Sequence, residues 1–225
     1  DKNSMSFLEQ YVNRIKYADK LHDTAVLNIS RHYVKLNQFE NAYKFLSILS
    51  TDNKDIFHDS LYSEVSHIQA RNKNFDLAVR TANGIRDKSK LNAIYYRISK
   101  EGLESNTNLY WAAQISNLMS SSWERDSLNY DLSLHYFNTN KFNRSEYFAD
   151  KILSRRNLQD VIYTYLIQDL VRMSKENKTR KNNLSLFKTH NNISQGYKND
   201  AIRIANKIYS KVLKNRSVRL INAIG

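Results

Sequence analysis

The chain has 225 residues, of which 41% are hydrophobic, so it is long enough to bury a sizeable core. It has no proline, no cysteine and only four glycines. This composition favours an all-helical fold and excludes disulfides, thiolate metal sites and cysteine nucleophiles. The formal net charge is +13, and twelve of the 35 Lys and Arg residues but two of the 22 acidic residues lie from Lys175 onward. Such asymmetry is typical of a surface that meets an anionic partner.

No segment approaches a run of about 18 apolar residues, so no transmembrane segment is expected. Neither composition nor the first residue, Asp1, decides the compartment. A soluble protein of the cytoplasm and an exported one after removal of its leader would look the same.

The first predicted element is a helix over residues 5–21, whose apolar residues recur at steps of three and four. We expect residues 1–22 to form an N-terminal capping helix. The second region, residues 23–156, contains a repeat. Four anchors, separated by 36, 34 and 33 residues, each follow one helix-type apolar run and precede another: Phe39, Phe75, Leu109 and Phe142. A period of about 34 residues that holds two helices is typical of stacked helical hairpins.

Small residues recur within this period. A serine lies midway along each predicted first helix, and a small residue lies early in each second helix; these are Ser30, Ser66, Ser99 and Ser133, then Ala42, Ala78, Ala112 and Ser145. Small side chains allow two helices to approach closely. The sequence therefore predicts four hairpins whose paired helices meet at these positions.

The segments Ile29-Ser-Arg-His-Tyr33…Phe39…Ala42 and Leu132-Ser-Leu-His-Tyr136…Phe142 carry an apolar–small–x–x–Tyr…Phe pattern. This pattern resembles the tetratricopeptide repeat (TPR), although Gln69 replaces the tyrosine in the second copy and the closing proline is absent. The resemblance implies an all-α, right-handed α-solenoid of about four TPR-like repeats whose first helices line a concave groove.

After the repeats, residues 157–225 are expected to form a basic helical cap. A fifth helix is predicted over Leu158–Met173, then a long loop at about 175–197. A final helix is predicted over about 199–214 and is a candidate partner for the fifth helix. Its inward residues are expected to be Ile202, Ala205, Ile208, Tyr209, Val212 and Leu213.

The chain lacks the common sequence signals of catalysis. It has no glycine-rich phosphate loop and no His-Glu-x-x-His motif, and its six histidines are scattered. His32 and His135 occupy equivalent repeat positions, which indicates a structural role. We therefore expect no enzyme activity, no cofactor and no metal.

The family resemblance implies which first-helix positions face the groove, namely Arg31, Lys35, His67, Arg71, Tyr96, Lys100, Tyr130, Leu134 and Phe137. One end of this set is basic and the other is aromatic and apolar, which suits a peptide or partner helix with an acidic part and bulky anchors. Some relatives clamp a C-terminal carboxylate with cations, but Glu64 occupies one matching position, so that activity is not expected. The predicted function is a protein–protein interaction scaffold, of undetermined oligomeric state.

The rival hypothesis places the site at the basic C-terminus, with Lys207, Lys211, Lys214 and Arg216 as a patch that neutralises the phosphates of a nucleic acid. Tyrosines, of which the chain has 15, are candidates for stacking on bases. An anionic membrane surface is a third candidate, because the final helix is basic and amphipathic.

Overall fold

The computed structural model describes residues 7, 10–12, 19–49, 54–104, 109–120, 122–181 and 187–223, and the side chains over the same ranges except 19–21 and 177–194. Throughout this part the chain is all-helical and contains no strand, which confirms the predicted fold class at that level. It divides into two compact units, Asp1–Ser120 and Ser121–Gly225. The predicted capping helix lies largely outside the described residues.

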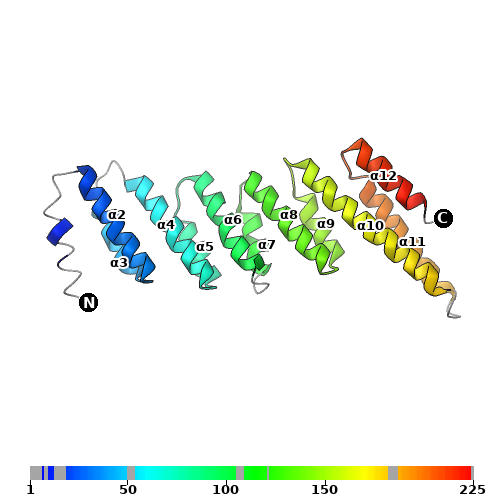
Figure 1. The fold of residues 1–225 in the computed structure, drawn as a ribbon, viewed down its shortest axis with the longest axis horizontal. Helices are drawn as coiled ribbons and strands as arrows, with labels where there is room; N and C mark the ends of the chain where they lie inside the picture. Colours follow the sequence, from blue (N-terminus) through cyan, green and yellow to red (C-terminus); the bar gives the residue numbers. More distant parts are fainter. Residues whose placement is uncertain are drawn as a thin grey trace. The chain divides into compact units, whose positions relative to one another are not determined.

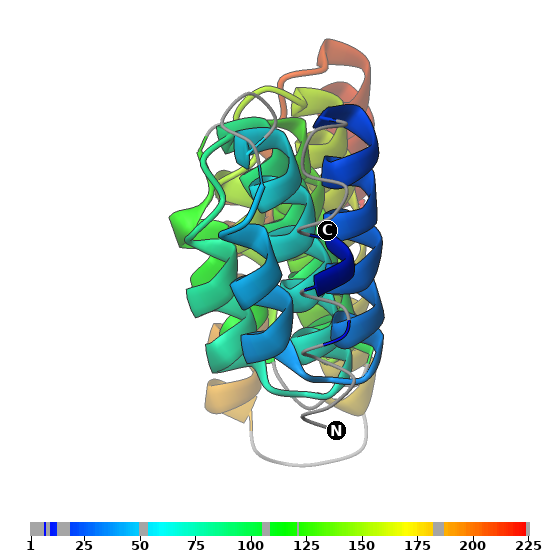
Figure 2. The same cartoon turned by 90° about the vertical axis from the view of Figure 1, so that its left-hand side faces the viewer.

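Unit 1 consists of helix pairs that follow one another along the chain. Its helices are α2 (Asp19–Lys35), α3 (Phe39–Leu46), α4 (Lys54–Arg71), α5 (Phe75–Ala82), α6 (Lys88–Glu104) and α7 (Leu109–Leu118). Each even-numbered helix packs against the next odd-numbered one as a hairpin, and α4 also packs against α2 and α6 (Figures 1 and 2). The long first helices are therefore neighbours of one another within this unit.

Unit 2 has two hairpins and a final helix. Its helices are α8 (Trp123–Asn138), α9 (Phe142–Asp150), α10 (Arg156–Lys181), α11 (Phe187–Ala205) and α12 (Lys211–Asn222). The pairs α8–α9 and α10–α11 form the hairpins, α10 packs against both α8 and α9, and α12 packs on α10 and α11 (Figure 1).

Three hairpins turn in the same way. The second residue after α2, α4 and α8 has a positive φ, at Asn37 (58°), Lys73 (62°) and Asn140 (57°). The next N–H then reaches back over the helix end, as in Lys141 N to Tyr136 O at 2.8 Å. This left-handed cap satisfies carbonyls that the helix leaves unpaired. It also starts the second helix within a few residues.

The predicted contacts between paired helices are buried. The serines midway along the first helices and the small residues of the second helices are at most 1% exposed. Tyr33 stacks on Phe45 with ring centroids 5.7 Å apart, and Tyr136 stacks on Phe148 at 5.5 Å. The same ring pair therefore fills the same place in the first and fourth hairpins.

A buried Asp or Asn on each of four first helices holds the loop after the paired second helix. The Asp59 carboxylate accepts from the backbone N–H groups of Arg86 and Asp87, both at 3.0 Å. Asp126 accepts three such bonds, from Leu153, Ser154 and Arg155 at 2.8–3.1 Å. Asn92 holds Ser120, and Asp160 holds Tyr209 and Ser210. We call these four residues the loop clamps.

The clamp at Asp160 identifies α10–α11 as a further hairpin with an insertion. Asp126 precedes its first bonded N–H by 27 residues, whereas Asp160 precedes its own by 49. The insertion lengthens both helices, so the predicted loop at about 175–197 was wrong: residues 175–181 and 187–197 are helical. The Lys- and Asn-rich composition misled the prediction. Asparagine is a weak helix former, but the packing of α10 against α11 overrides this local preference.

The predicted final helix over 199–214 is interrupted. α11 ends at Ala205 and α12 begins at Lys211, with Ser210 as its N-cap. Because the chain turns at residues 206–210, the expected inward stripe does not continue. Ala205 and Ile208 are buried and Leu213 is half-buried, as predicted. Ile202, Tyr209 and Val212 are 44%, 70% and 78% exposed, contrary to the prediction.

Candidate functional site

The predicted groove residues belong to two surfaces, which are described separately because they lie in different units. Six of the nine are on α2, α4 and α6 of unit 1, and the other three are on α8 of unit 2. The former include all the predicted cations of the groove. The latter are the predicted aromatic and apolar end.

In unit 1, two of the predicted groove residues contact a carboxylate on the first helix of the following hairpin. Arg31 Nε donates to Glu64 Oε1 at 2.7 Å, and its Nη2 donates to Ser60 Oγ at 3.2 Å. Glu64, which has the wrong sign for a carboxylate clamp, is thus the partner of Arg31. Because both side chains are more than a third exposed, solvent weakens this ion pair. The pair neutralises charge more than it stabilises the fold.

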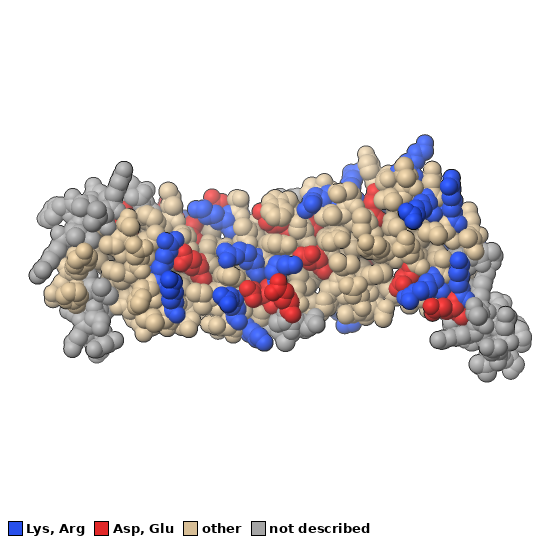
Figure 3. Space-filling model, in the orientation of Figure 1, with Lys and Arg blue, Asp and Glu red and all other residues tan. Residues whose placement is uncertain are grey.

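His67 continues the same pattern between α4 and α6. Arg97 donates to His67 Nδ1 at 3.0 Å, and His67 Nε2 lies 3.1 Å from Glu101 Oε1. Figure 3 accordingly shows Lys and Arg interleaved with Asp and Glu over the first helices of this unit. Tyr96 and Lys100 are half-buried. Lys35 and Arg71 are exposed and have no carboxylate partner among the residues that the structure describes.

In unit 2, the three predicted apolar residues lie together on the first-helix surface. Tyr130, Leu134 and Phe137 are half-buried and pack against the core. The Phe137 ring lies 5.9 Å from that of Tyr165, which comes from α10 and is 41% exposed. We call Tyr130, Leu134, Phe137 and Tyr165 the aromatic face. Figure 3 shows uncharged side chains over this part of α8 and α10.

Burial affects the chemistry of the aromatic face. The pKa of Tyr130 is raised, first by burial and then by Tyr165 and Asp131 nearby. A tyrosine hydroxyl is protonated at neutral pH and can donate a hydrogen bond, and the raised pKa extends this to more alkaline pH. Sequence analysis missed Tyr165, which the apolar period assigns to the buried stripe of α10. Its distance from Phe137 depends on how α8 and α10 pack together, which the sequence does not give.

Lys207 differs from the other residues of the predicted basic patch, because acidic side chains contact it. Lys207 Nζ donates to Glu146 Oε1 at 2.8 Å and to Asp150 Oδ2 at 2.7 Å. Arg203 makes two bonds to the same Glu146 carboxylate, which is nearly buried. Burial alone would raise the pKa of Glu146, but the hydrogen bonds from Arg203 and Lys207 lower it. Lys207 is therefore an internal counter-ion, unlike Lys211, Lys214 and Arg216 on α12.

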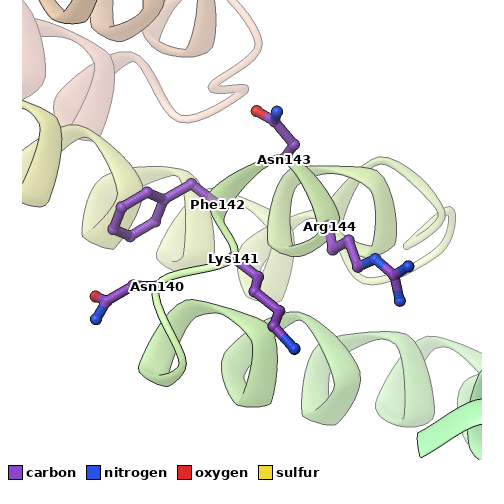
Figure 4. Close-up of a pocket in the computed structure, with 5 residues that line it drawn as sticks. All are labelled: Asn140, Lys141, Phe142, Asn143 and Arg144. Atoms are coloured by element: carbon purple, nitrogen blue, oxygen red, sulfur yellow. The ribbon is translucent and has the colours of Figure 1, made fainter.

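Two hollows lie at hairpin turns, and neither is an enclosed site. One of about 350 Å³ is lined by Asn140–Arg144, where Phe142 points away from Lys141 and Arg144 (Figure 4). A hollow of about 380 Å³ lies at the equivalent residues 37–41. Their recurrence follows from the shared turn geometry, so we do not assign them to a ligand.

Within the described ranges, no three His, Asp or Glu side chains are grouped so that they could hold a metal. The helices there are also too short or too polar to cross a bilayer. Comparison with known proteins found no matching family model, no matching curated protein and no matching solved structure.

Proposed function

We propose that this chain is a TPR-like α-solenoid that serves as a protein–protein interaction scaffold, and that a segment of its partner binds the first-helix surface. The aromatic face carries the proposal. It combines four aromatic or apolar side chains on two neighbouring helices, and Tyr165 is 41% exposed. Aromatic residues in partly desolvated positions are typical anchors of protein interfaces.

The charges of unit 1 favour a particular kind of partner. Since Arg31 and His67 already face carboxylates, strong attraction of an acidic peptide is not expected there. The preferred partner is an apolar segment, such as the aromatic or leucine-rich side of a helix, bound at the aromatic face of unit 2.

Selection from a library of short random peptides tests the proposal. We expect the intact protein to enrich peptides with bulky apolar anchors. The double variant Tyr130→Ser/Tyr165→Ser should weaken the selected peptides by at least about tenfold, or ~1.4 kcal/mol. Tyr110 and Tyr147 lie on second helices and are 65% and 51% exposed, so Tyr110→Ser/Tyr147→Ser is a matched control. A selection without enrichment, or peptides equally weakened by the control, would contradict the proposal.

A further inference from the structure

The last helix of unit 2 carries positive charge that nothing nearby in the sequence balances. Residues 201–225 contain six Lys or Arg residues and no Asp or Glu. Two of the six, Arg203 and Lys207, are engaged by Glu146 and Asp150. The other four are all on α12. We call these the cationic face: Lys211, Lys214, Arg216 and Arg219. Figure 3 shows Lys and Arg side chains gathered over this helix.

The helix that presents these cations is fixed in place. Ser217 and Ile221 of α12 are buried, and Leu213 packs against the core cluster of unit 2. At its start, Ser210 Oγ accepts from Leu213 N, and the Asp160 carboxylate accepts from the N–H groups of Tyr209 and Ser210, both at 2.8 Å. The cations therefore project from a preorganised element. A ligand that binds them does not have to order the helix first.

The packing of α12 on α10 and α11 also distinguishes between two candidate anionic ligands, a membrane and a nucleic acid. An amphipathic helix binds a membrane by inserting its apolar stripe among the lipids. On α12, Leu213 and Ile221 pack against the core of unit 2, which leaves Val212 and Val218 as its exposed apolar side chains, too few to form a stripe for insertion. The charged side remains available, which favours a ligand that is recognised through its phosphates.

Tyr209 adds an aromatic surface beside the cations. It directly precedes α12 and its N-cap, and it is 70% exposed. The Arg156 guanidinium lies 4.5 Å from the centre of its ring. Proteins bind single-stranded nucleic acids through exposed aromatic rings that lie among cations. The bases stack on the rings and the cations contact the phosphates.

We propose that the cationic face and Tyr209 bind single-stranded nucleic acid, with Lys211, Lys214, Arg216 and Arg219 on phosphates and Tyr209 under a base. Recognition of this kind is largely independent of sequence. The site is separate from the aromatic face, so each can be tested without the other.

The test is fluorescence anisotropy of a labelled single-stranded oligonucleotide of mixed sequence, titrated with the full chain at several salt concentrations. Arg216→Glu/Arg219→Glu should lower the affinity at least tenfold. If each arginine meets one phosphate, the slope of log affinity against log salt should become shallower by about 0.7 for each phosphate that is no longer neutralised. Lys73→Glu/Lys88→Glu is the control, since it changes net charge equally at exposed sites of unit 1.

The stacking role has its own variant. Tyr209→Ser should weaken binding by about 5- to 100-fold and leave the salt slope unchanged, because stacking releases no counterions. Melting curves of all variants should match that of the unmodified protein, since the changed side chains are exposed.

Several outcomes would overturn the proposal. The oligonucleotide could fail to bind at low salt, or the two charge-reversed proteins could lose affinity equally. Vesicles rich in phosphatidylserine could bind while the oligonucleotide does not, which would assign the face to a membrane instead. Peptide selection on Arg216→Glu/Arg219→Glu should be unchanged, so a failure here does not decide the function proposed for the aromatic face.

Discussion

Lys73 occupies a backbone conformation that its two counterparts fill with asparagine. Asn37, Lys73 and Asn140 all have φ near 60° and end a first helix in the same way. A lysine side chain is strained there, because its Cβ crowds the carbonyl oxygen, whereas asparagine tolerates this conformation. The sequence alignment of Asn37-Gln-Phe39 with Asn140-Lys-Phe142 already indicates equivalent turns. The positive φ is the physical reason for that likeness.

Lys73→Asn should therefore stabilise the protein, by about 0.5–1 kcal/mol. Chemical denaturation followed by circular dichroism measures the gain. Asn140→Lys makes the opposite exchange at the equivalent turn and should cost a similar amount. If neither variant moved the denaturation midpoint, the conformation of the turn would not limit stability.

The residue scale also shows where sequence reasoning ends. The loop clamps have a sequence signal, since Asp59, Asn92 and Asp126 each precede a buried serine by seven residues. That signal becomes meaningful only once the partners are seen to be backbone N–H groups. Tyr209 could not be placed from the sequence, because its exposure depends on where α11 stops.

At the scale of elements, the hairpins were predictable and the insertion was not. The apolar periodicity and the buried small residues predict the helices of residues 23–156 well, because two helices pack together at each small side chain. In α10–α11 the same period is broken by 22 added residues. Composition alone then assigns them to a loop. Pairing of the two helices decides otherwise.

Removal of residues 175–196 tests this interpretation. Ser174 would then join Tyr197, and the chain from Asp160 to Ala201 would match that from Asp126 to Ser145. Ser174 would fall at the position of Asn140, which needs a positive φ, so the design adds Ser174→Asn. We expect a cooperatively unfolding, helical protein. The same deletion with two extra residues after Asp200, inside the second helix, shifts the helix register and is the control.

If the shortened protein lost its cooperative transition while the register-shifted control kept it, α10–α11 would not be a repeat with an insertion. If both kept it, the hairpin would tolerate a shift that the buried contacts of Ala201 and Ala205 should forbid. The expected result is a lower melting temperature for the control alone.

At the scale of the whole molecule, buried carboxylates link the fold to pH. Burial alone would raise the pKa values of Asp59 and Asp126, but the backbone and side-chain hydrogen bonds that they accept lower both. Glu146 behaves in the same way through Arg203 and Lys207. All three groups bind protons less readily in the folded chain than in the unfolded chain.

The sign of the pH dependence follows. A carboxylate whose pKa is lowered by folding stabilises the folded state fully above its unfolded value, about 4. That contribution is lost as the pH falls further, through the folded pKa. The free energy of unfolding should therefore be nearly constant from neutral pH to about pH 5 and should fall steeply below about pH 4.

Asp126 provides the sharpest test, because its carboxylate accepts from three successive backbone N–H groups. Asp126→Ala should cost about 1–3 kcal/mol near neutral pH, since it leaves buried donors unpaired. Asp126→Asn should cost less, because Asn92 performs the same task in the preceding hairpin with an amide. The asparagine does not titrate, so the variant's deficit in free energy of unfolding relative to the unmodified protein should shrink as the pH falls toward 2. Chemical denaturation at several pH values measures this change. A deficit that stayed constant with pH would show that the carboxylate keeps an ordinary pKa and that acid unfolds the chain through other groups.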